Sequence, residues 1–155
     1  MTLAVGDKAP DFTLYSADSE RITLSELTTR KRRAVVVFFY PKDDTPGCTT
    51  EACGFRDQTK DFSKKNAVIL GVSADSIDSH VKFKKKFGLP FQLLADTDKK
   101  AIEAYGVWKE KSMYGRKYMG IERTTFVIGA DGRIQKIFPK VSVTGHVDAV
   151  LATLS

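Results

Sequence analysis

Runs of consecutive apolar residues divide the chain into strand-length segments. Ala34–Phe39, Ala67–Val72 and Thr124–Ile128 are rich in β-branched and aromatic residues and do not alternate with polar ones. Such runs are typical of strands that are buried on both faces of a sheet covered by helices. Phe91–Ala95 predicts a further short strand, and the alternating segment Ile134–Phe138 predicts a strand with one exposed face.

Segments with helical spacing lie between these strands. Thr45 is a good N-cap residue and Pro46 suits the first helical position, so a helix is predicted from here to about residues 64–66. Further helices are predicted over residues 76–87 and 98–105 and from Thr144 to the C-terminus. This alternation of strands and helices predicts an α/β fold, with a central mixed sheet flanked by helices on both faces.

The remaining segments are expected to be peripheral. Residues 9–14 and 21–24 predict an N-terminal β-hairpin extension. Residues 28–33 predict a charged loop. Residues 107–123 predict a surface loop, with a strand or a turn inside it as an open alternative, because their aromatic, Met, basic and Gly residues follow no clear period. The chain of 155 residues suits one domain with a single core, which we assign to residues 1–155.

Composition narrows the class of protein. No apolar run approaches the roughly 20 residues that span a bilayer, and the N-terminus does not resemble a secretory signal, so we expect a cytoplasmic protein without a membrane partner. The net charge of +6 is compatible with nucleic-acid binding, but the basic residues are spread along the chain. No recognisable nucleic-acid motif accompanies them, so we expect no such partner.

The chain has two cysteines, Cys48 and Cys53, at the junction between a predicted strand and a helix. In the cytosol such a pair is more often catalytic or redox-sensing than a structural disulfide. Free N–H groups at the helix start would favour a thiolate, Gly47 allows close approach, and Thr45 offers a hydroxyl. The alternative is a pair of small core residues. Two cysteines and two scattered histidines lack zinc-site spacing, and we expect no metal and no cofactor.

The segment around Cys48 resembles a known family. Pro41-x-x-x-Thr45-x-x-Cys48 is similar to the active-site signature of the peroxiredoxins, and the run from Tyr40 to Cys53 is similar to that of the peroxiredoxin Q branch, also called bacterioferritin comigratory protein. The resemblance covers most of the chain. It includes three further segments, which are residues 6–12, 71–75 and 123–128.

The resemblance implies a thioredoxin-like fold and a thiol-dependent peroxidase that reduces hydrogen peroxide and organic hydroperoxides. It implies that Cys48 is the peroxidatic cysteine and that Pro41 shields it from water. It also implies that Thr45 hydrogen-bonds the peroxide and that Arg123 supplies a cation. In a thioredoxin-like sheet, the strand from Thr124 runs antiparallel to the strand that ends at Phe39, which would bring Arg123 near Cys48.

From the cysteine pair and the chemistry of sulfenic acids, we expect Cys53 to be the resolving cysteine, which would form an intrachain disulfide that thioredoxin or a similar dithiol reduces. Residues five apart on a helix are rotated by ~140° and separated by ~7.5 Å along its axis. A disulfide needs Cα atoms within about 7 Å, so the helix would have to open. Alternatively, Cys53 is a core residue and an outside thiol resolves Cys48. Intrachain resolution favours a monomer.

Several alternatives stay open. A thioredoxin-like disulfide reductase shares the fold but normally has Cys-x-x-Cys spacing, and a non-enzymatic redox sensor or holdase would use the same thiols. Glu51 is a support candidate that would hydrogen-bond either backbone N–H groups or the Arg123 side chain. Arg56 and Asp57 either pair at the surface or support the loop. Neither His80 nor His146 pairs obviously with Cys48. Four residues of the 107–123 segment are expected to pack over the sheet edge rather than line a channel or a reductase dock: Trp108, Tyr114, Tyr118 and Met119.

Overall fold

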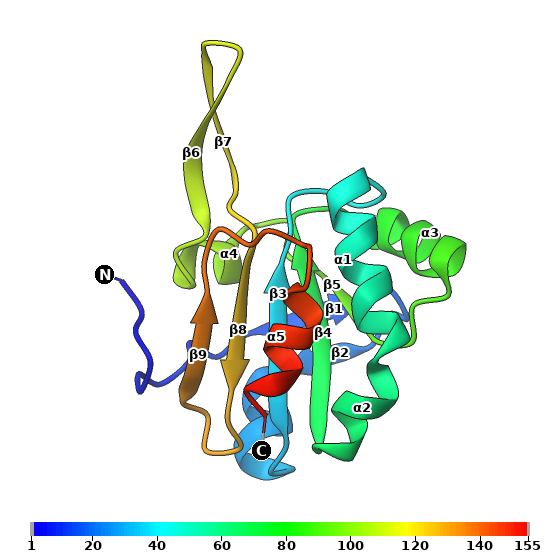
Figure 1. Ribbon diagram of the computed structural model, residues 1–155, viewed down its shortest axis with the longest axis vertical. Coiled ribbons are helices and arrows are strands. Elements are labelled where there is room, and N and C mark those ends of the chain that lie inside the picture. Colours follow the sequence, from blue (N-terminus) through cyan, green and yellow to red (C-terminus); the bar gives the residue numbers. More distant parts are fainter. Residues whose placement is uncertain (1, 155) are drawn as a thin grey trace.

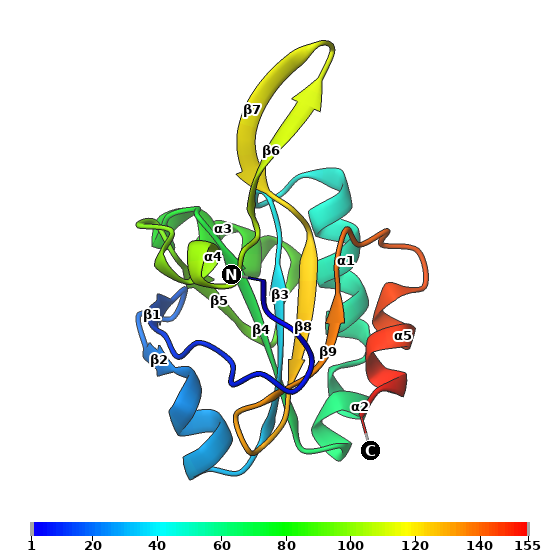
Figure 2. The same cartoon turned by 90° about the vertical axis from the view of Figure 1, so that its left-hand side faces the viewer.

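The main sheet carries seven strands, and a separate two-stranded hairpin projects from one end of it (Figures 1 and 2). The computed structural model describes residues 2–154. Its strands are β1 (Thr13–Ser16), β2 (Arg21–Thr23), β3 (Ala34–Phe39), β4 (Ala67–Ser73), β5 (Gln92–Ala95), β6 (Trp108–Met113), β7 (Arg116–Ile121), β8 (Thr124–Ile128) and β9 (Ile134–Phe138). Its helices are the π-helix η1 (Glu26–Arg30) and the α-helices α1 (Pro46–Asp57), α2 (Thr59–Lys64), α3 (Ile77–Phe87), α4 (Lys100–Ala104) and α5 (His146–Ala152).

The strands of the main sheet follow the order β2-β1-β5-β4-β3-β8-β9. β3, β4 and β5 are parallel, whereas β8 runs antiparallel to β3. The register pairs Phe39, the last residue of β3, with Thr124, the first residue of β8. The loop that leaves β3 and the residue that precedes β8 therefore meet at the same edge of the sheet.

The side chains of β3 alternate between two hydrophobic cores, which explains its unbroken apolar sequence. Val35 and Val37 pack on the face covered by α4 and the N-terminal segment. Val36 and Phe38 pack on the opposite face, with residues of α1, α2, α3 and α5. Cys48 belongs to this second core. The predicted α/β fold class, a mixed sheet with helices on both faces, is therefore confirmed.

The predicted N-terminal hairpin is also present, with a shifted first strand. β1 and β2 pair antiparallel, and β1 joins the main sheet by pairing with β5. β1 begins only at Thr13, because the residues before it reach into the core as an irregular segment in which Ala9 and Phe12 are buried. The hairpin thus extends the sheet beyond β5.

The prediction of a surface loop over residues 107–123 is corrected. The open alternative of a strand inside the segment is closer, since β6 and β7 form a regular antiparallel hairpin there. These strands pair only with each other, and Tyr114 at the turn is 96% exposed. The other exposed apolar residues of the hairpin are Met113, Tyr118 and Met119. Of the four residues expected to pack over the sheet edge, Trp108 packs against the core at the base of the hairpin, and the expectation fails for the other three.

Helix boundaries differ from the prediction at several points. α4 is shorter than predicted, at Lys100–Ala104 rather than 98–105. The helix after Thr45 breaks at Gln58, where the backbone leaves the helical region at φ −113° and ψ 12°, and so forms α1 and α2. The segment predicted as a charged loop over residues 28–33 overlaps the end of η1. The last helix begins after Gly145 rather than at Thr144, because the chain turns there with a φ of 71° that favours glycine.

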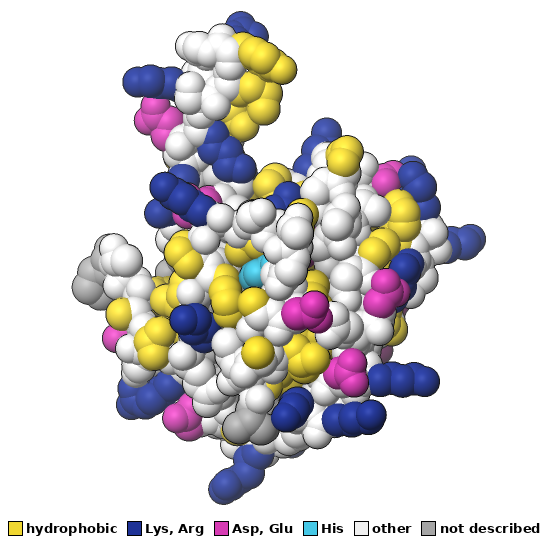
Figure 3. All heavy atoms as spheres, in the orientation of Figure 1, with side chains coloured by type: hydrophobic (Ala, Val, Ile, Leu, Met, Phe, Trp, Pro, Cys, Tyr) yellow, Lys and Arg dark blue, Asp and Glu magenta, His cyan; other side chains and the backbone are white. Residues whose placement is uncertain are grey.

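Charges of both signs are interspersed on the face shown in Figure 3, and apolar side chains gather at the tip of the projecting hairpin. Among residues 2–154 no helix has the length and apolar character that crossing a bilayer requires.

Candidate active site

Cys48 lies in the first turn of α1, directly after the loop that leaves β3. Pro46 occupies the first helical position, and Thr45 is the N-cap residue with an extended backbone, at φ −96° and ψ 155°. The first N–H groups of a helix have no acceptor within it, and together with the helix dipole they favour a negative charge on a nearby sulfur. Cys48 is only 1% exposed, so little water competes for that charge.

Arg123 contacts the Cys48 sulfur directly. Its Nη2 donates to Sγ at 3.3 Å, across the sheet edge where β3 ends and β8 begins. The predicted proximity of these two residues is therefore confirmed. A guanidinium at this distance stabilises a thiolate by charge and by a hydrogen bond, and it would also stabilise negative charge on a bound oxygen.

Gly47 makes room for this contact. A Cβ atom at position 47 would lie 3.0 Å from Nη2 of Arg123, closer than side chains normally approach. The backbone of Gly47 does not have a positive φ, so glycine is not needed here for its conformational freedom. It is needed because it has no side chain to occupy this space. The glycine allows the guanidinium to lie close against the start of α1.

Glu51, one turn after Cys48, holds Arg123 from the other side. Its Oε1 accepts from Nη1 of Arg123 at 2.7 Å, which confirms the expected support. Burial raises the pKa of Glu51 to about 7, although the charge and hydrogen bond of Arg123 act against that rise. Its second oxygen, Oε2, is buried and has no hydrogen-bond partner among the described residues. The carboxyl group is therefore near its titration point at neutral pH.

His146, at the start of α5, faces this unpartnered oxygen. Its Nε2 lies 2.8 Å from the Thr125 hydroxyl and 3.8 Å from Oε2 of Glu51. Burial, followed by the positive charge of Arg123, lowers the pKa of His146 to about 4. The imidazole is therefore neutral at physiological pH, and its first link to the site runs through Glu51 rather than Cys48.

Lys111, in β6, places a further positive charge close to the site. Partial burial, followed by the charge of Arg123, lowers the pKa of Lys111, while the charge of Cys48 acts in the opposite direction. This coupling brings one residue of the projecting hairpin into the electrostatic surroundings of the sulfur. The sequence prediction did not include it, because the segment has no visible period.

Thr45 and Pro41 lie in the loop between β3 and α1, and both are partly exposed. The Thr45 hydroxyl donates to the Lys42 carbonyl at 2.8 Å instead of capping the helix. With its proton engaged, this oxygen is left to accept a hydrogen bond, and the O–H of a hydroperoxide is a suitable donor. Pro41 has no N–H to donate and precedes the buried Asp43 by two residues.

Cys53 lies on the same helix as Cys48 and is half-buried, and both thiols are free. With α1 intact, the step of five positions from Cys48 to Cys53 corresponds to ~140° of rotation and ~7.5 Å of rise. The two cysteines cannot bond in this state. The chemistry that the pair can perform therefore depends on whether α1 opens.

Arg56 and Asp57 pair with each other at 2.9 Å near the end of α1. Arg56 also donates from Nη1 to the Phe87 carbonyl at 2.8 Å, which ties the end of α1 to the end of α3. The pair therefore lies at the far end of the helix from Cys48 and does not support the loop.

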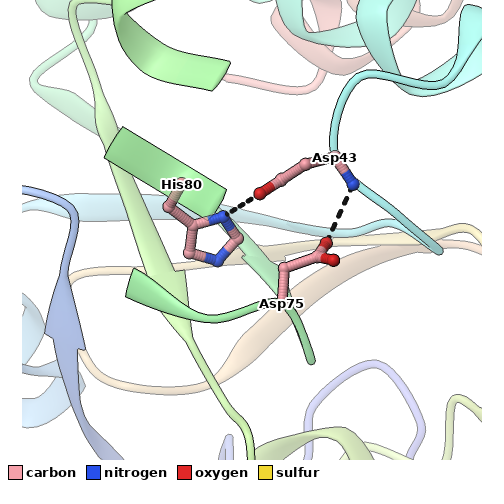
Figure 4. Close-up of side chains that lie close together, drawn as sticks. All are labelled: Asp43, Asp75 and His80. Carbon is pink, nitrogen blue, oxygen red and sulfur yellow. Dashed lines mark hydrogen bonds and ion pairs between the residues drawn. The ribbon is translucent and has the colours of Figure 1, made fainter. Parts of the chain in front are cut away.

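Three further polar residues near the site could not be paired from the sequence, because Asp43 lies far along the chain from the other two. Asp43, Asp75 and His80 meet beneath the loop between β3 and α1 (Figure 4). Their potential ligand atoms lie within 4.8 Å of one another, as in a metal site. His80 and Asp43 approach to 2.7 Å, however, and each of these side chains already bonds protein groups. The arrangement is that of a hydrogen-bonded network.

Comparisons with known proteins agree with this geometry. The AhpC/TSA family matches residues 5–137. Peroxiredoxin Bcp of Bacillus subtilis is 51% identical over 154 residues, which cover 99% of this chain and 96% of that protein. A cysteine-to-serine mutant of PrxQ from Xylella fastidiosa has a similar crystal structure, with a TM-score of 0.91 and 39% identity over 98% of this chain and 95% of the other.

A structure of the bacterioferritin comigratory protein of Xanthomonas campestris, reported for the alkyl peroxide reduction activity of that protein, matches with a TM-score of 0.87. It is 41% identical and covers 97% of this chain and 94% of that chain. These likenesses extend over nearly the whole length of each protein. The chain therefore belongs to the AhpC/TSA family, within its peroxiredoxins of the Q or Bcp type, and is a thiol-dependent peroxidase with a thioredoxin-like fold.

Proposed function

We propose that Cys48 is the peroxidatic cysteine of this enzyme and that it reduces hydrogen peroxide and organic hydroperoxides. The observation that carries the proposal is the 3.3 Å contact between the Arg123 guanidinium and the Cys48 sulfur at the start of α1. A cation and a helix N-terminus converge on one buried sulfur. These are the surroundings that generate and orient a thiolate.

In the first step, the Cys48 thiolate attacks one oxygen of the peroxide. An S–O bond forms and the O–O bond breaks, so the sulfur is oxidised by two electrons to a sulfenic acid. The departing oxygen leaves as alkoxide or hydroxide and takes a proton to give an alcohol or water. Arg123 lies where it can stabilise the charge that develops on that oxygen, and Thr45 can accept from the peroxide O–H.

In the second step, we assign Cys53 as the resolving cysteine. Its thiolate attacks the sulfur of the sulfenic acid, an S–S bond forms, and the S–O bond breaks to release hydroxide, which is protonated to water. The first turns of α1 must open for this attack. Oxidation itself favours the opening, because the neutral sulfenic acid no longer offers the charge that the helix N-terminus and Arg123 stabilise.

A thioredoxin-type dithiol completes the cycle by reducing the Cys48–Cys53 disulfide through exchange. We place this cycle in the cytoplasm, where dithiol reductants of this kind maintain thiols. Since both cysteines belong to one chain, no partner subunit is needed, and we propose a monomer without a nucleic-acid or membrane partner. Sedimentation of the reduced and oxidised protein should give one monomeric species in each case.

The test combines two variants with stopped-flow oxidation by hydrogen peroxide. Cys48→Ser should abolish peroxide consumption. Cys53→Ser should keep the rapid first oxidation, accumulate a sulfenic acid that dimedone traps at Cys48, and lose thioredoxin-supported turnover. Rapid peroxide consumption by Cys48→Ser would overturn the assignment of the nucleophile, and undiminished turnover of Cys53→Ser would overturn the assignment of the resolving residue.

A further inference from the structure

The loop between β3 and α1 is fastened from below by a buried polar network (Figure 4). The Asp43 backbone N–H donates to Oδ2 of Asp75 at 2.8 Å, and the Ser73 hydroxyl donates to the same oxygen at 2.7 Å. The Asp43 side chain turns inwards to His80 of α3, with 2.7 Å between Oδ2 and Nδ1. Asp43 is only 7% exposed and His80 is fully buried, so water does not compete for these bonds.

The partners of His80 fix the number of its protons. Nε2 lies 2.9 Å from the Leu94 carbonyl of β5, and a carbonyl only accepts, so Nε2 must carry hydrogen. Nδ1 lies 2.7 Å from a carboxyl oxygen of Asp43, so a proton must also lie between these two atoms. A neutral imidazole beside an ionised carboxylate satisfies only one of the two contacts. The pair is either imidazolium with carboxylate or neutral imidazole with carboxylic acid.

The surroundings of Asp43 favour the carboxylate. Its Oδ1 accepts from the Tyr40 hydroxyl at 2.6 Å and its Oδ2 from the Ser79 hydroxyl at 2.8 Å. Burial, followed by the charge of Asp43, raises the pKa of Tyr40 well above its ordinary value, so the phenol stays protonated and donates. The groups that face His80 are thus Tyr40 and Asp43, from the loop that follows β3, and Asp75, from the loop that follows β4. None of them is a cation.

We propose that His80 is a buried imidazolium that acts as a positioning residue, because it clamps Asp43 and thereby holds the loop that delivers Cys48 to peroxide. Asp43 lies two residues after Pro41 and two before Thr45. Opening of the first turn of α1 pulls on this same loop. The bond between His80 and Asp43 therefore sets the balance between two forms of the protein. In the closed form Cys48 attacks peroxide, and in the open form Cys53 reaches Cys48. This second role rests on the proposed function.

The first test reads the proton directly. The chain has two histidines, so nitrogen-15 correlation spectra of the reduced wild-type protein at pH 7.5 contain two imidazole systems, and His80→Gln assigns them. His80 should show two protonated ring nitrogens, whereas His146 should show the pattern of a neutral ring. A single protonated nitrogen on His80 would overturn the proposal.

The second test separates positioning from packing with two amide substitutions. His80→Asn places an amide nitrogen near the position of Nδ1, where it can still donate to Asp43. His80→Gln reaches towards Leu94 instead. In the Cys53→Ser background, which isolates the first oxidation, His80→Gln should slow oxidation of Cys48 by about tenfold, as expected for the loss of one charge-assisted hydrogen bond. His80→Asn should recover a large part of that rate.

With Cys53 intact, His80→Gln should also close the disulfide several-fold faster than wild type, since the clamp no longer opposes opening. Ile102→Val, in the core on the other face of the sheet, is the control for a general loss of stability and should change neither step. Equal loss of oxidation rate in His80→Gln and His80→Asn would make His80 a packing residue and overturn the proposal. If wild type itself forms no Cys48–Cys53 disulfide, it is the proposed resolving step that fails, while the oxidation rates still test the clamp.

Discussion

Two buried carboxyl groups flank the start of α1, and each faces a buried histidine. Beneath the loop, Asp43 lies 2.7 Å from His80 and accepts from two hydroxyl groups as well. Inside the helix, Glu51 lies 3.8 Å from His146, and its facing oxygen has no hydrogen-bond partner among residues 2–154. The residue types are nearly the same, but the first pair is saturated with hydrogen bonds and the second is not.

Hydrogen-bond donors, and not burial alone, decide the charge of a buried acid. Glu51 has one strong donor, Arg123, and burial still raises its pKa to about 7. An acid with several donors keeps its charge at a similar depth. The saturated pair therefore suits a fixed mechanical role, and the unsaturated pair suits a site whose charge must respond to chemistry at the neighbouring sulfur.

The unsaturated pair also exchanges one proton on folding. Around pH 5.5 in the unfolded chain, His146 is protonated and Glu51 is ionised, because their ordinary pKa values are 6.5 and 4.5. In the folded chain the values are about 4 and about 7, so His146 is neutral and Glu51 holds the proton. The folded and unfolded states each bind one proton on this pair. The pair therefore makes the free energy of unfolding almost independent of pH around pH 5.5.

Removal of Arg123 breaks the comparison most strongly, because both the Cys48 sulfur and Glu51 lose their cation. Arg123→Gln should lower the rate constant for oxidation of Cys48 by roughly 10²–10³-fold, the usual loss for one preorganised charge-stabilising donor. Stopped-flow oxidation by hydrogen peroxide measures it. Arg123→Lys keeps the charge but lacks the planar fork that reaches Glu51 and Cys48 from two separate nitrogens, and should fall in between. A loss below tenfold for Arg123→Gln would contradict the role of this contact.

Neutralising each acid in turn sharpens the comparison. Asp43→Asn should lower the free energy of unfolding by about 3 kcal/mol at pH 7.5, because it removes one partner of a buried, hydrogen-bonded charge pair. Glu51→Gln should cost less than about 1 kcal/mol, since the amide oxygen can still accept from Arg123 and no fully formed charge is lost. Urea unfolding measures both values. Equal costs would show that the two carboxyl groups do not differ in charge.

In wild type the contributions of Glu51 and His146 to the pH dependence of the free energy of unfolding cancel. Variants that lack one of the two residues should show the contribution of the other. In His146→Gln only Glu51 titrates, and its folded pKa is raised, so the folded state binds the extra proton and stability should fall by up to ~3 kcal/mol as pH rises from about 4.5 to 7. In Glu51→Gln only His146 titrates, and its folded pKa is lowered. Stability should therefore rise by up to ~3 kcal/mol as pH rises from about 4 to 6.5.

Urea unfolding at pH 5.0, 6.0 and 7.0 tests both slopes, with wild type as the reference. Slopes of opposite sign in the two variants, with a nearly flat wild type between pH 5.0 and 6.0, are the expected result. Parallel curves for all three proteins would contradict the exchange of a proton between the two residues.

The smallest expected effect comes from Gly47→Ala, which leaves all charges in place. The new methyl group would lie 3.0 Å from the Arg123 guanidinium and must displace it. A shift of a few tenths of an ångström should slow oxidation of Cys48 by about three- to tenfold, because charge-stabilising contacts depend on position. Gly54→Ala is the matched control on the same helix, where the methyl group meets Val147 instead. It should leave the oxidation rate of Cys48 unchanged.

The central strands could be predicted because burial on both faces leaves an unmistakable apolar run. The hairpin β6–β7 could not, because its strands pair only with each other and expose most side chains. The break at Gln58 was missed because the apolar spacing continues through it, with both Phe55 and Phe62 buried. In each case the pattern of apolar and polar residues indicates which side chains are buried. It does not indicate which backbone groups form hydrogen bonds with each other.

The candidate site likewise contains residues that could be predicted from the sequence and residues that could not. Cys48, Thr45 and Arg123 were found through their resemblance to a known signature, and Glu51 through its helical spacing from Cys48. The clamp beneath the loop was not found, because Asp43 and His80 lie 37 positions apart. A single sequence shows which residues could ionise, but not which of them the folded chain brings together.

The break between α1 and α2 also has a consequence for amide exchange with solvent. Because α2 has its own buried anchor in Phe62 and Gln58 donates to Asp148 at 2.6 Å, opening of α1 can stop at Gln58. Amide hydrogens of residues 49–57 should therefore exchange with deuterium through a low-energy local opening, whereas those of β3 and β4 should exchange only through global unfolding. If Cys53 resolves Cys48 as proposed, the opening that this step requires would be confined to the 12 residues of α1. The rest of the protein would then stay folded during the step and would not become exposed to aggregation or proteolysis.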